Sequence, residues 1–319
     1  MLDKLHEDFL GVQKNVPLKN YTTYKIGGSA KYFFVAKNKE DMTGAINFAK
    51  KNKLLIFILG GGSNLLVSDK GFNGLVVKIS NSDIKFEGNK LLVDAGANAN
   101  KVAHMCTERK LSGLEWVSGI PLATIGGTIF GNGQAFGEKI SDIIESVEVL
   151  NLKTLKFSTL TKKQCQFTLK SSAFKKNKNL LIVSAVLLLK EKTEEEIKDK
   201  IKDFLKHRRT KHPMEFPSAG STFVNPEIKI RNKNMLEKFP ELSDFNNKGI
   251  IPAGYLIAKC GLAGKKIGNA QISEKHANFI INLGGAKAKD VLALIKLAKQ
   301  KVKKVFNINL ETEIQLIGF

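Results

Sequence analysis

Three consecutive glycines at the end of an apolar run constrain the fold of this chain more than any other feature. The run, residues 54–59, predicts a buried strand because apolar side chains follow one another without interruption. Glycine has no Cβ, so the backbone beyond the strand can turn through positive φ and direct several N–H groups at one point. Such a nest suits a phosphate or a pyrophosphate, whereas a tight turn between two strands would use the same residues. Either structure would be built from Gly60, Gly61, Gly62, Ser63 and Asn64.

The chain has 319 residues, of which 43% are hydrophobic, enough for two or three packed units. Its formal net charge of +21 raises the question of a nucleic-acid partner. All but four of the 51 basic residues are lysines, however, and they are scattered through every segment. Nucleic-acid surfaces usually concentrate their charge and favour the two-pronged hydrogen bonding of arginine. The composition therefore disfavours a nucleic-acid partner, and a polyanionic small substrate such as a nucleotide fits the positive charge equally well.

Signals for membrane insertion, secretion and metal binding are missing from the sequence. No apolar run approaches the length of a membrane span, and the first ten residues have no apolar core of the signal-peptide kind. We therefore expect a cytoplasmic protein with no membrane partner. Cys106, Cys165 and Cys260 are far apart and show no CxxC spacing, so neither a metal site nor a disulfide framework is expected. Each cysteine is expected to be a small buried hydrophobe.

Hydrophobic spacing predicts two domains. The predicted strands are 32–36, 54–59, 75–79, 91–95, 147–150 and 180–189, and the predicted helices are 40–50 and 98–110. Thr193 and Glu196 form a capping box that begins a further helix, and we place the domain boundary just before it. Residues 1–191 are expected to form one domain, with α+β subdomains at about 1–85 and 86–191, and residues 192–319 a smaller one. No GxGxxG follows a strand and no GxxxxGK[ST] occurs, so the nucleotide-binding folds that these motifs mark are not supported.

A second glycine-rich stretch, residues 118–137, holds six glycines in twenty residues. It is too apolar and too regular for a flexible linker, so it predicts either a backbone that passes close against a flat ligand or a glycine-rich turn region. Together with the first stretch it resembles the FAD-binding segments of flavoproteins of the vanillyl-alcohol-oxidase type, which carry GGGSN and a later GIP…GG…N…AFG. Gln134 stands where these proteins usually have glycine. The resemblance implies that FAD is held by Gly60, Gly61, Gly62, Ser63 and Asn64 and by Gly119, Ile120, Pro121, Gly126, Gly127, Asn132 and Gly137.

The last third of the chain holds two candidate catalytic side chains. Three prolines within residues 207–226 predict an extended, turning loop around Ser221. Ser221 lacks the GxSxG setting of a nucleophile, so the local residues alone favour an inert turn serine. Residues 227–251 resemble a polar insertion, and a long helix is predicted at 288–305. Alternation near the C-terminal end places Glu313 on the polar side of a strand, where it would be a solvated carboxylate if nothing else were known.

Motifs along nearly the whole chain together resemble the UDP-N-acetylenolpyruvoylglucosamine reductase family. They are KIGG, GGGSN, GIP…GG, KxP…AGSxFxNP, AGxLI…GLxGxxIGxAxISxKHAxFIxN and a late LExE. The resemblance implies an α+β fold, with a two-part FAD-binding domain of the vanillyl-alcohol-oxidase type and a smaller α/β substrate-binding domain. It also implies reduction of UDP-N-acetylglucosamine enolpyruvate to UDP-N-acetylmuramate, a peptidoglycan precursor, with NADPH as the hydride donor.

The same resemblance implies catalytic roles for three residues. Ser221 corresponds to the family's proton donor, and Glu313 to a late glutamate that helps to protonate or position the intermediate. Lys170, in the segment CQFTLKSS, stands where the family has an arginine. Lysine keeps the positive charge but loses the planar two-point grip on a carboxylate.

The UDP-sugar substrate would be contacted by Lys211, Asn225 and His276, and for His276 a structural role fits equally well. Two other classes of protein stay possible on the sequence. Another flavin-dependent oxidoreductase of the same cofactor fold would lack the AGSTFVNP and SEKHANF blocks that this chain carries. A basic nucleic-acid-binding protein would bind no flavin, so the visible absorption spectrum distinguishes it.

Overall fold

The computed structural model describes residues 10–319, and the chain folds into two compact units. The first unit consists of the chain up to Pro17, Ser29–Gly62 and Phe72–Arg208. The second consists of Leu18–Gly28, Ser63–Gly71 and Arg209–Phe319. In the C-terminal half the units divide at Arg208, further along the chain than the boundary of about residue 191 that the sequence predicts. Arg208 belongs to the first unit because its guanidinium donates to the carbonyl oxygens of Trp116 (2.8 Å) and Ser118 (3.0 Å).

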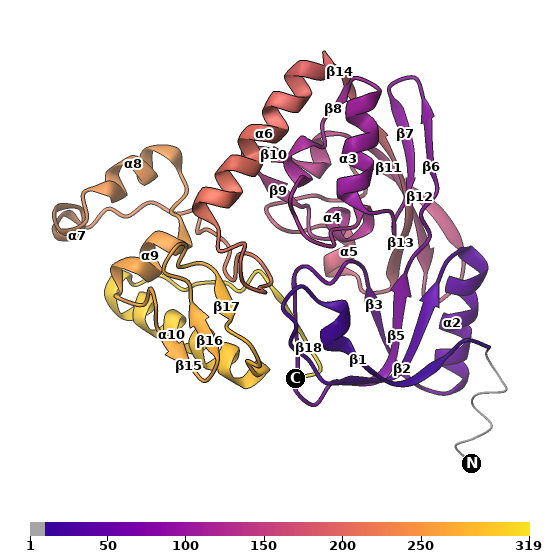
Figure 1. The fold of residues 1–319 in the computed structure, drawn as a ribbon, viewed down its shortest axis with the longest axis horizontal. Coiled ribbons are helices and arrows are strands. Elements are labelled where there is room, and N and C mark those ends of the chain that lie inside the picture. Colours follow the sequence, from indigo (N-terminus) through magenta and orange to yellow (C-terminus); the bar gives the residue numbers. More distant parts are fainter. Residues whose placement is uncertain (1–9) are drawn as a thin grey trace. The chain divides into compact units, whose positions relative to one another are not determined.

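Four strands form the first sheet of the first unit, in the order β1-β2-β5-β3 (Figure 1). They are β1 (Gln13–Pro17), β2 (Ser29–Ala36), β3 (Leu55–Leu59) and β5 (Phe72–Ile79). β1 is antiparallel to β2, whereas β2, β5 and β3 run parallel to one another. α2 (Lys39–Lys51) packs against β2, β3 and β5 through one apolar face, as its periodicity predicts.

The apolar run before the three glycines forms β3, but the prediction that this strand is buried is wrong. β3 is an edge strand, and Leu55 is 68% exposed. Leu59, the last residue of the strand, is 2% exposed. A run of apolar residues predicts a strand without showing how many of its sides are covered. Because Leu59 is buried, the strand is nonetheless anchored in the core at the residue directly before the glycine loop.

The second sheet of the first unit is antiparallel throughout, in the order β12-β11-β13-β7-β6. Its strands are β6 (Ile84–Glu87), β7 (Lys90–Asp94), β11 (Ile144–Asn151), β12 (Phe157–Thr161) and β13 (Leu180–Leu188). The helices that accompany it are α3 (Ala99–Glu108), α4 (Ile125–Phe130), α5 (Ala173–Lys176) and α6 (Glu194–Lys211), with the 3₁₀ helices η2 (Glu115–Val117) and η3 (Ile140–Asp142). Two short pairs complete the unit: β8 (Leu111–Ser112) with β14 (Lys190–Glu191), and β9 (Gln134–Ala135) with β10 (Glu138–Lys139). One hydrophobic core extends through both sheets.

The predicted capping box at the start of α6 is confirmed. The backbone N–H of Thr193 donates to the Glu196 carboxylate (2.9 Å), and the N–H of Glu196 donates to the Thr193 hydroxyl (3.2 Å). These two bonds satisfy N–H groups that have no partner within the helix. The helix therefore begins where the sequence predicts.

The second unit combines the C-terminal part of the chain with two short N-terminal segments. A three-stranded antiparallel sheet has the order β15-β16-β17, and β18 pairs in parallel with β4. These elements are β4 (Leu65–Val67), β15 (Lys266–Ile267), β16 (Ala270–Ile272), β17 (Ile280–Asn282) and β18 (Gln315–Ile317), with η1 (Leu18–Tyr21), α7 (Lys233–Lys238), α8 (Glu241–Lys248), α9 (Ala253–Lys259) and α10 (Ala288–Phe306). Tyr24, Ile26 and Leu66 are buried in the core of this unit, which is why their segments belong to it.

The cysteines are free thiols. Cys106 and Cys165 are buried, as predicted, and burial raises the pKa of their thiols to about 12 and about 11 because the thiolate loses hydration. Both therefore stay neutral and pack as small apolar groups. Cys260 is only partly buried, so the prediction of burial is wrong at this position.

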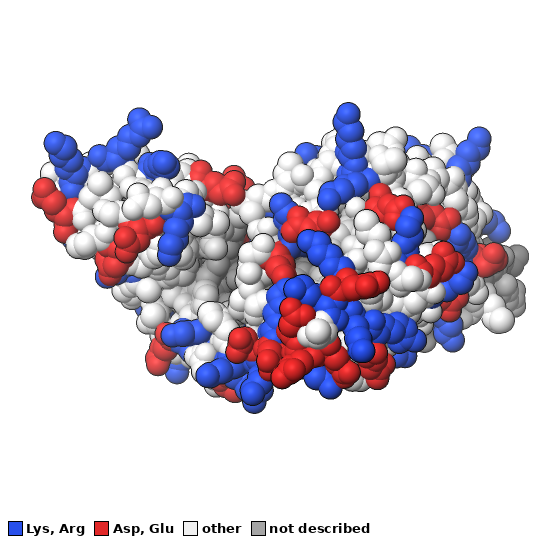
Figure 2. All heavy atoms as spheres, turned by 90° about the horizontal axis from the view of Figure 1, so that it is seen from above, with Lys and Arg blue, Asp and Glu red and all other residues white. Residues whose placement is uncertain are grey.

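Charged side chains of both signs share the surface. Figure 2 shows one face, on which lysine and arginine are interspersed with aspartate and glutamate. Ion pairs with the spacing of one helical turn occur at the start of α6, between Glu194 and Lys198 (2.6 Å) and between Glu196 and Lys192, which precedes the helix (2.9 Å). In the part of the chain that the structure describes, none of the helices has the length and apolar character needed to cross a membrane.

Candidate active site

The first glycine loop follows β3 directly and is held at its first residue. The Lys78 ammonium on β5 donates to the Gly60 carbonyl oxygen (2.6 Å), and burial lowers the pKa of this lysine. Gly62 adopts φ +72°, which favours glycine. A Cβ at Gly61 would lie 1.6 Å from the Leu122 carbonyl oxygen. The two predicted FAD-binding stretches therefore touch here, and only glycine leaves room for that contact.

The second glycine stretch is pinned by Asn100, a residue that the sequence analysis missed. The N–H of Gly119 donates to the Asn100 Oδ1 atom (2.8 Å), and the Asn100 Nδ2 group donates to the Ile120 carbonyl oxygen (2.8 Å). Asn100 lies on α3, one residue after the helix begins, and nothing in its local sequence indicates this contact. The segment that continues to Pro121 therefore has a fixed backbone path.

Close backbone packing continues into α4. A Cβ at Gly126 would lie 2.7 Å from the Ala95 Cβ atom, and its N–H donates to the Ala95 carbonyl oxygen (2.8 Å). Thr124 caps the helix by accepting from the N–H of Gly127 (3.3 Å). The small residues of this stretch are thus required by the packing of the protein itself.

Asn132 connects the second glycine stretch to the segment that carries Lys170. Its side chain is almost completely buried, and its Nδ2 group donates to the Thr168 carbonyl oxygen (2.8 Å). Its Oδ1 atom is buried without a hydrogen-bond partner among the described residues. Such an atom carries a desolvation penalty of about 1–3 kcal/mol unless a ligand or water supplies a donor. Asn132 is therefore placed where a bound ligand can complete its hydrogen bonds.

Lys170 occupies a tight turn. Thr168 and Ser171 exchange two backbone hydrogen bonds (3.0 and 3.2 Å), and Lys170 between them has φ +50°. The Lys175 ammonium donates to the Lys170 carbonyl oxygen (2.9 Å), and the Ser172 hydroxyl donates to the Phe130 carbonyl oxygen (2.7 Å). The backbone that presents the Lys170 side chain is therefore held on both sides.

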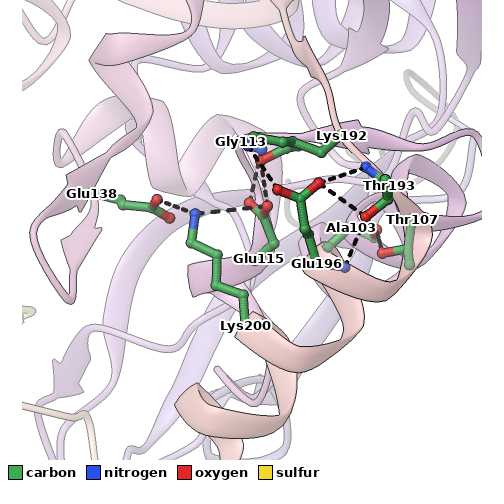
Figure 3. A network of polar contacts seen from close by, with 10 residues as sticks. Ala103, Thr107, Gly113, Glu115, Glu138, Lys192, Thr193, Glu196 and Lys200 are labelled. Carbon is green, nitrogen blue, oxygen red and sulfur yellow. Dashed lines mark hydrogen bonds and ion pairs between the residues drawn. The ribbon is translucent and has the colours of Figure 1, made fainter.

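α6 packs against the hairpin β9–β10, which lies at the end of the second glycine stretch. Phe136 has φ +56°, a conformation that is rare for a bulky residue. Its ring stacks on Phe204 (4.3 Å between centroids, 5° between planes), and the Arg208 guanidinium lies 5.1 Å from its centre. Figure 3 shows the polar side of this contact: Lys200 on α6 forms ion pairs with Glu138 and Glu115. These contacts hold Phe136, and with it the neighbouring Gly137, against the rest of the unit.

In the second unit, Ser221 and Glu313 lie on segments that are paired with each other. The N–H of Glu313 donates to the carbonyl oxygen of Thr222 (2.8 Å), the residue after Ser221. Val224 donates to the Glu311 carbonyl oxygen (2.9 Å), which extends the same pairing. Ser221 and Glu313 are both half-buried. Residues that are 92 positions apart in the sequence are therefore neighbours here.

Asn64, a predicted FAD contact, also supports Glu313. Its Nδ2 group donates to the Glu313 carbonyl oxygen (3.4 Å), and its own carbonyl oxygen accepts from the Gln315 N–H (3.0 Å). Ser63 and Asn64 belong to the second unit, although they follow the three glycines directly. The chain therefore passes from the glycine loop straight into the strand β4 that pairs beside Glu313.

The three predicted substrate contacts differ in their surroundings. Lys211 is exposed at the end of α6. Asn225 uses its Oδ1 atom to accept the N–H of Ala253 at the start of α9 (2.9 Å). His276 packs edge-on against Phe279 (4.9 Å), whose backbone pairs with Ser221. His276 thus lies near Ser221, and Asn225 four residues further along the same segment.

The described residues form no group of three His, Cys, Asp or Glu side chains able to hold a metal ion. The residues of the first unit do fit FAD. Two glycine stretches touch at a point where a Cβ would collide, and the buried Asn132 Oδ1 atom has no hydrogen-bond donor within residues 10–319. This fold and this site define an FAD-binding flavoprotein, and a family model described as FAD binding domain matches residues 30–154.

A second family model, UDP-N-acetylenolpyruvoylglucosamine reductase, C-terminal domain, matches residues 212–317. The chain belongs to the UDP-N-acetylenolpyruvoylglucosamine reductase family. It is 35% identical to the reductase of that name from Clostridium novyi over 308 residues, which are 96% of this chain and 92% of the relative. It is 40% identical to the one from Caldicellulosiruptor bescii over 308 residues, 96% of this chain and 90% of the relative.

A solved structure gives the same result. The crystal structure of UDP-N-acetylenolpyruvylglucosamine reductase from Thermus caldophilus matches with a TM-score of 0.77 and 30% identity, over 97% of this chain and 100% of that one. The predicted family, the predicted α+β fold class and FAD as the cofactor are thereby confirmed. The particular residues assigned to the site stay predictions.

Gly61→Ala is expected to weaken FAD binding, because its methyl group would force the two glycine stretches apart. Overpacking against backbone costs about 1–3 kcal/mol, equivalent to about 5- to 150-fold weaker binding. Flavin fluorescence titration of the apoprotein measures the dissociation constant. Gly131→Ala is the control, since its Cβ would meet nothing closer than 3.9 Å. Equal affinities in the two variants would show that the contact at Gly61 does not shape the FAD site.

Proposed function

We propose that this chain is the NADPH-dependent flavoenzyme that reduces UDP-N-acetylglucosamine enolpyruvate to UDP-N-acetylmuramate, for peptidoglycan synthesis in the cytoplasm. One observation carries the proposal beyond family membership. In the second unit, the backbone of Glu313 is paired with the residue next to Ser221. A proton donor and a carboxylate on neighbouring segments are what the protonation of a carbon centre requires.

FAD, held by the two glycine stretches, would supply the hydride for the methylene carbon of the enolpyruvyl group, with NADPH as the hydride donor. The double-bond electrons then move to the other carbon and its carboxylate, and this carbon must gain a proton. Ser221 supplies that proton from its Oγ atom. A hydroxyl is a weak acid, but a carbanion-like enolate is a far stronger base, so the transfer is downhill. Glu313 helps to protonate or position the intermediate.

Lys170 supplies positive charge for the substrate carboxylate as negative charge grows on the enolate. A fixed cation in a site with little water stabilises such charge far more than it would in bulk water. The turn between Thr168 and Ser171, with the Lys175 contact to its carbonyl oxygen, supports this role because it fixes the backbone of Lys170. Lysine acts there as a point charge.

Lys211, Asn225 and His276 contact the UDP-sugar. Lys211 has an exposed ammonium that suits a diphosphate. The Oδ1 atom of Asn225 is occupied by Ala253, so its Nδ2 group is the one that donates to the substrate. The Nδ1 atom of His276 accepts from the Asn278 N–H (3.2 Å), which fixes the orientation in which the ring would meet the substrate.

The purified protein is expected to be yellow and, in the absence of oxygen, to consume NADPH beyond the amount that reduces its flavin only when the enolpyruvyl substrate is present. Visible absorption detects the flavin, and the loss of NADPH absorbance measures turnover. UDP-N-acetylglucosamine, which lacks the enolpyruvyl group, is the control substrate. A colourless protein that takes up no added FAD, or NADPH consumption that ignores the substrate, would contradict the proposal.

A further inference from the structure

Asn278 is a buried side chain that holds the segment containing Ser221. It lies in the turn between β16 and β17 and is 3% exposed. Its Oδ1 atom accepts from the Phe223 N–H (2.9 Å), and its Nδ2 group donates to the Phe223 carbonyl oxygen (2.9 Å). Its own carbonyl oxygen accepts from the Thr222 N–H (2.7 Å). A side-chain amide thus takes the place that the peptide of a neighbouring strand would occupy.

The segment from Ser221 to Phe223 needs this support because it is not part of a regular sheet. It forms only isolated bridges, Ser221 with Phe279 and Phe223 with Thr312. Phe223 is 1% exposed, so its backbone N–H and carbonyl groups must find partners inside the protein. Each of these backbone groups that lacked a hydrogen-bond partner would destabilise the folded state by about 1–3 kcal/mol.

Glu313 contacts the opposite side of the same segment. Its N–H donates to the Thr222 carbonyl oxygen (2.8 Å), while the Thr222 N–H donates to Asn278. Thr222 is therefore hydrogen-bonded to Asn278 through its N–H group and to Glu313 through its carbonyl oxygen. Loss of the Asn278 side chain leaves these backbone bonds of Thr222 in place, but it removes the partners of the Phe223 N–H and carbonyl groups, two residues from Ser221.

Asn278 also contacts a third candidate residue. Its backbone N–H donates to the Nδ1 atom of His276 (3.2 Å), so this ring atom acts as an acceptor. His276 packs against Phe279, which in turn pairs with Ser221. The contacts of Asn278 thus extend to both segments that border Ser221.

We propose that Asn278 is a positioning residue for proton transfer, which fixes the backbone of Ser221 relative to Glu313. The inference rests on the proposed role of Ser221. A misplacement of about 1 Å at a reacting group can cost about 10²-fold in rate. Asn278→Ala is therefore expected to slow the oxidation of reduced flavin by the enolpyruvyl substrate about 10- to 100-fold. The reduction of flavin by NADPH needs no proton from Ser221 and is expected to keep its rate.

Asn282→Ala is the matched control. Asn282 is also 3% exposed and lies in the same unit. Its side chain makes three hydrogen bonds, to Tyr24, Gly284 and Ala286, one more than that of Asn278. A general loss of stability would therefore affect this variant at least as strongly. Its rate for the substrate half-reaction should nevertheless exceed that of Asn278→Ala.

Asn278→Asp distinguishes a positioning role of residue 278 from a merely structural one. A protonated carboxyl can donate to the Phe223 carbonyl oxygen and accept from its N–H, so it replaces the amide. An ionised carboxylate faces that carbonyl oxygen without a proton. We expect the substrate half-reaction of this variant to slow as pH rises through the pKa of the new carboxyl, which burial raises. Wild type should lack this transition.

Stopped-flow absorbance of the holoenzyme, at several pH values, measures both half-reactions in all four proteins. A slowed substrate half-reaction in Asn278→Ala, together with the new pH transition in Asn278→Asp, supports the proposal. Rates equal to wild type, equal slowing of both half-reactions, or the same loss in Asn282→Ala would overturn it. Failure of wild-type protein to react with the enolpyruvyl substrate would instead overturn the proposed function.

Discussion

Ser221→Ala is expected to leave the reduction of flavin by NADPH nearly unchanged and to slow the reduction of the enolpyruvyl substrate about 10²–10⁴-fold. The substitution should affect the two half-reactions differently, because hydride transfer from NADPH to flavin requires no proton from Ser221. Protonation of the substrate carbon does require one. Stopped-flow absorbance of the flavin, first with NADPH and then with substrate, resolves the two steps.

Ser218→Ala is a suitable control for this experiment. Ser218 lies in the same proline-rich loop, and its hydroxyl accepts only a long hydrogen bond from Gly220 (3.5 Å) among the contacts described. The same loss of a hydroxyl at this position should change neither half-reaction. If Ser221→Ala slowed both half-reactions equally, Ser221 would be a structural residue.

Lys170→Met is expected to slow the substrate half-reaction about 10²–10³-fold, and Lys170→Arg to be tolerated. Methionine keeps most of the apolar stem but removes the charge, so the developing enolate loses its counter-charge. Arginine keeps that charge and adds a fork of donors. Reoxidation of pre-reduced protein by substrate isolates the affected step.

Lys176→Met controls for the change in net charge. Lys176 lies on α5, six residues from Lys170, and is exposed. Removing its charge should leave the rate near that of wild type, because exposed charges are screened by salt. A near-native rate in Lys170→Met would mean that the cation comes from another residue.

Local patterns predicted the features that depend on neighbours in the sequence. The glycine stretches, the capping box of α6 and the apolar face of α10 each follow from backbone freedom, end groups or helical periodicity. At the end of α10, helical periodicity predicts the wrong buried residue, one position before the residue that is buried. Val305 is the last residue of the helix predicted at 288–305, and helical spacing places it on the apolar face, yet it is 36% exposed. Phe306 is buried instead, beside Phe239 (4.9 Å between rings). A large ring at a helix end can reach the core from a position that a valine cannot use.

Long-range hydrogen bonds could not be predicted, because side-chain amides carry no periodic signal. Asn100, Asn64 and Asn278 each bind backbone groups that are remote in the sequence or belong to another loop. Nothing in the immediate neighbours of Asn100 and Asn278 distinguishes them from turn or surface asparagines, and the motif that marks Asn64 does not predict its bond to Glu313. Only the folded arrangement shows that they support the predicted cofactor and catalytic residues.

The assignment of residues 18–28 and 63–71 to the second unit could not be predicted from the sequence either. Both segments precede the predicted domain boundary by more than a hundred residues, and their apolar side chains would fit either core. β4 pairs with β18, which follows Glu313, and a Cβ at Gly318 would lie 1.9 Å from the Gly71 carbonyl oxygen. This parallel pairing joins two segments that are far apart in the sequence, and no local pattern predicts it.

Anaerobic titration of the purified holoprotein tests the central claim most directly. NADPH should bleach the flavin absorbance, and UDP-N-acetylglucosamine enolpyruvate should then restore it completely, with one UDP-N-acetylmuramate formed per flavin. Flavin that NADPH does not bleach, or that stays bleached after the substrate is added, would contradict the account.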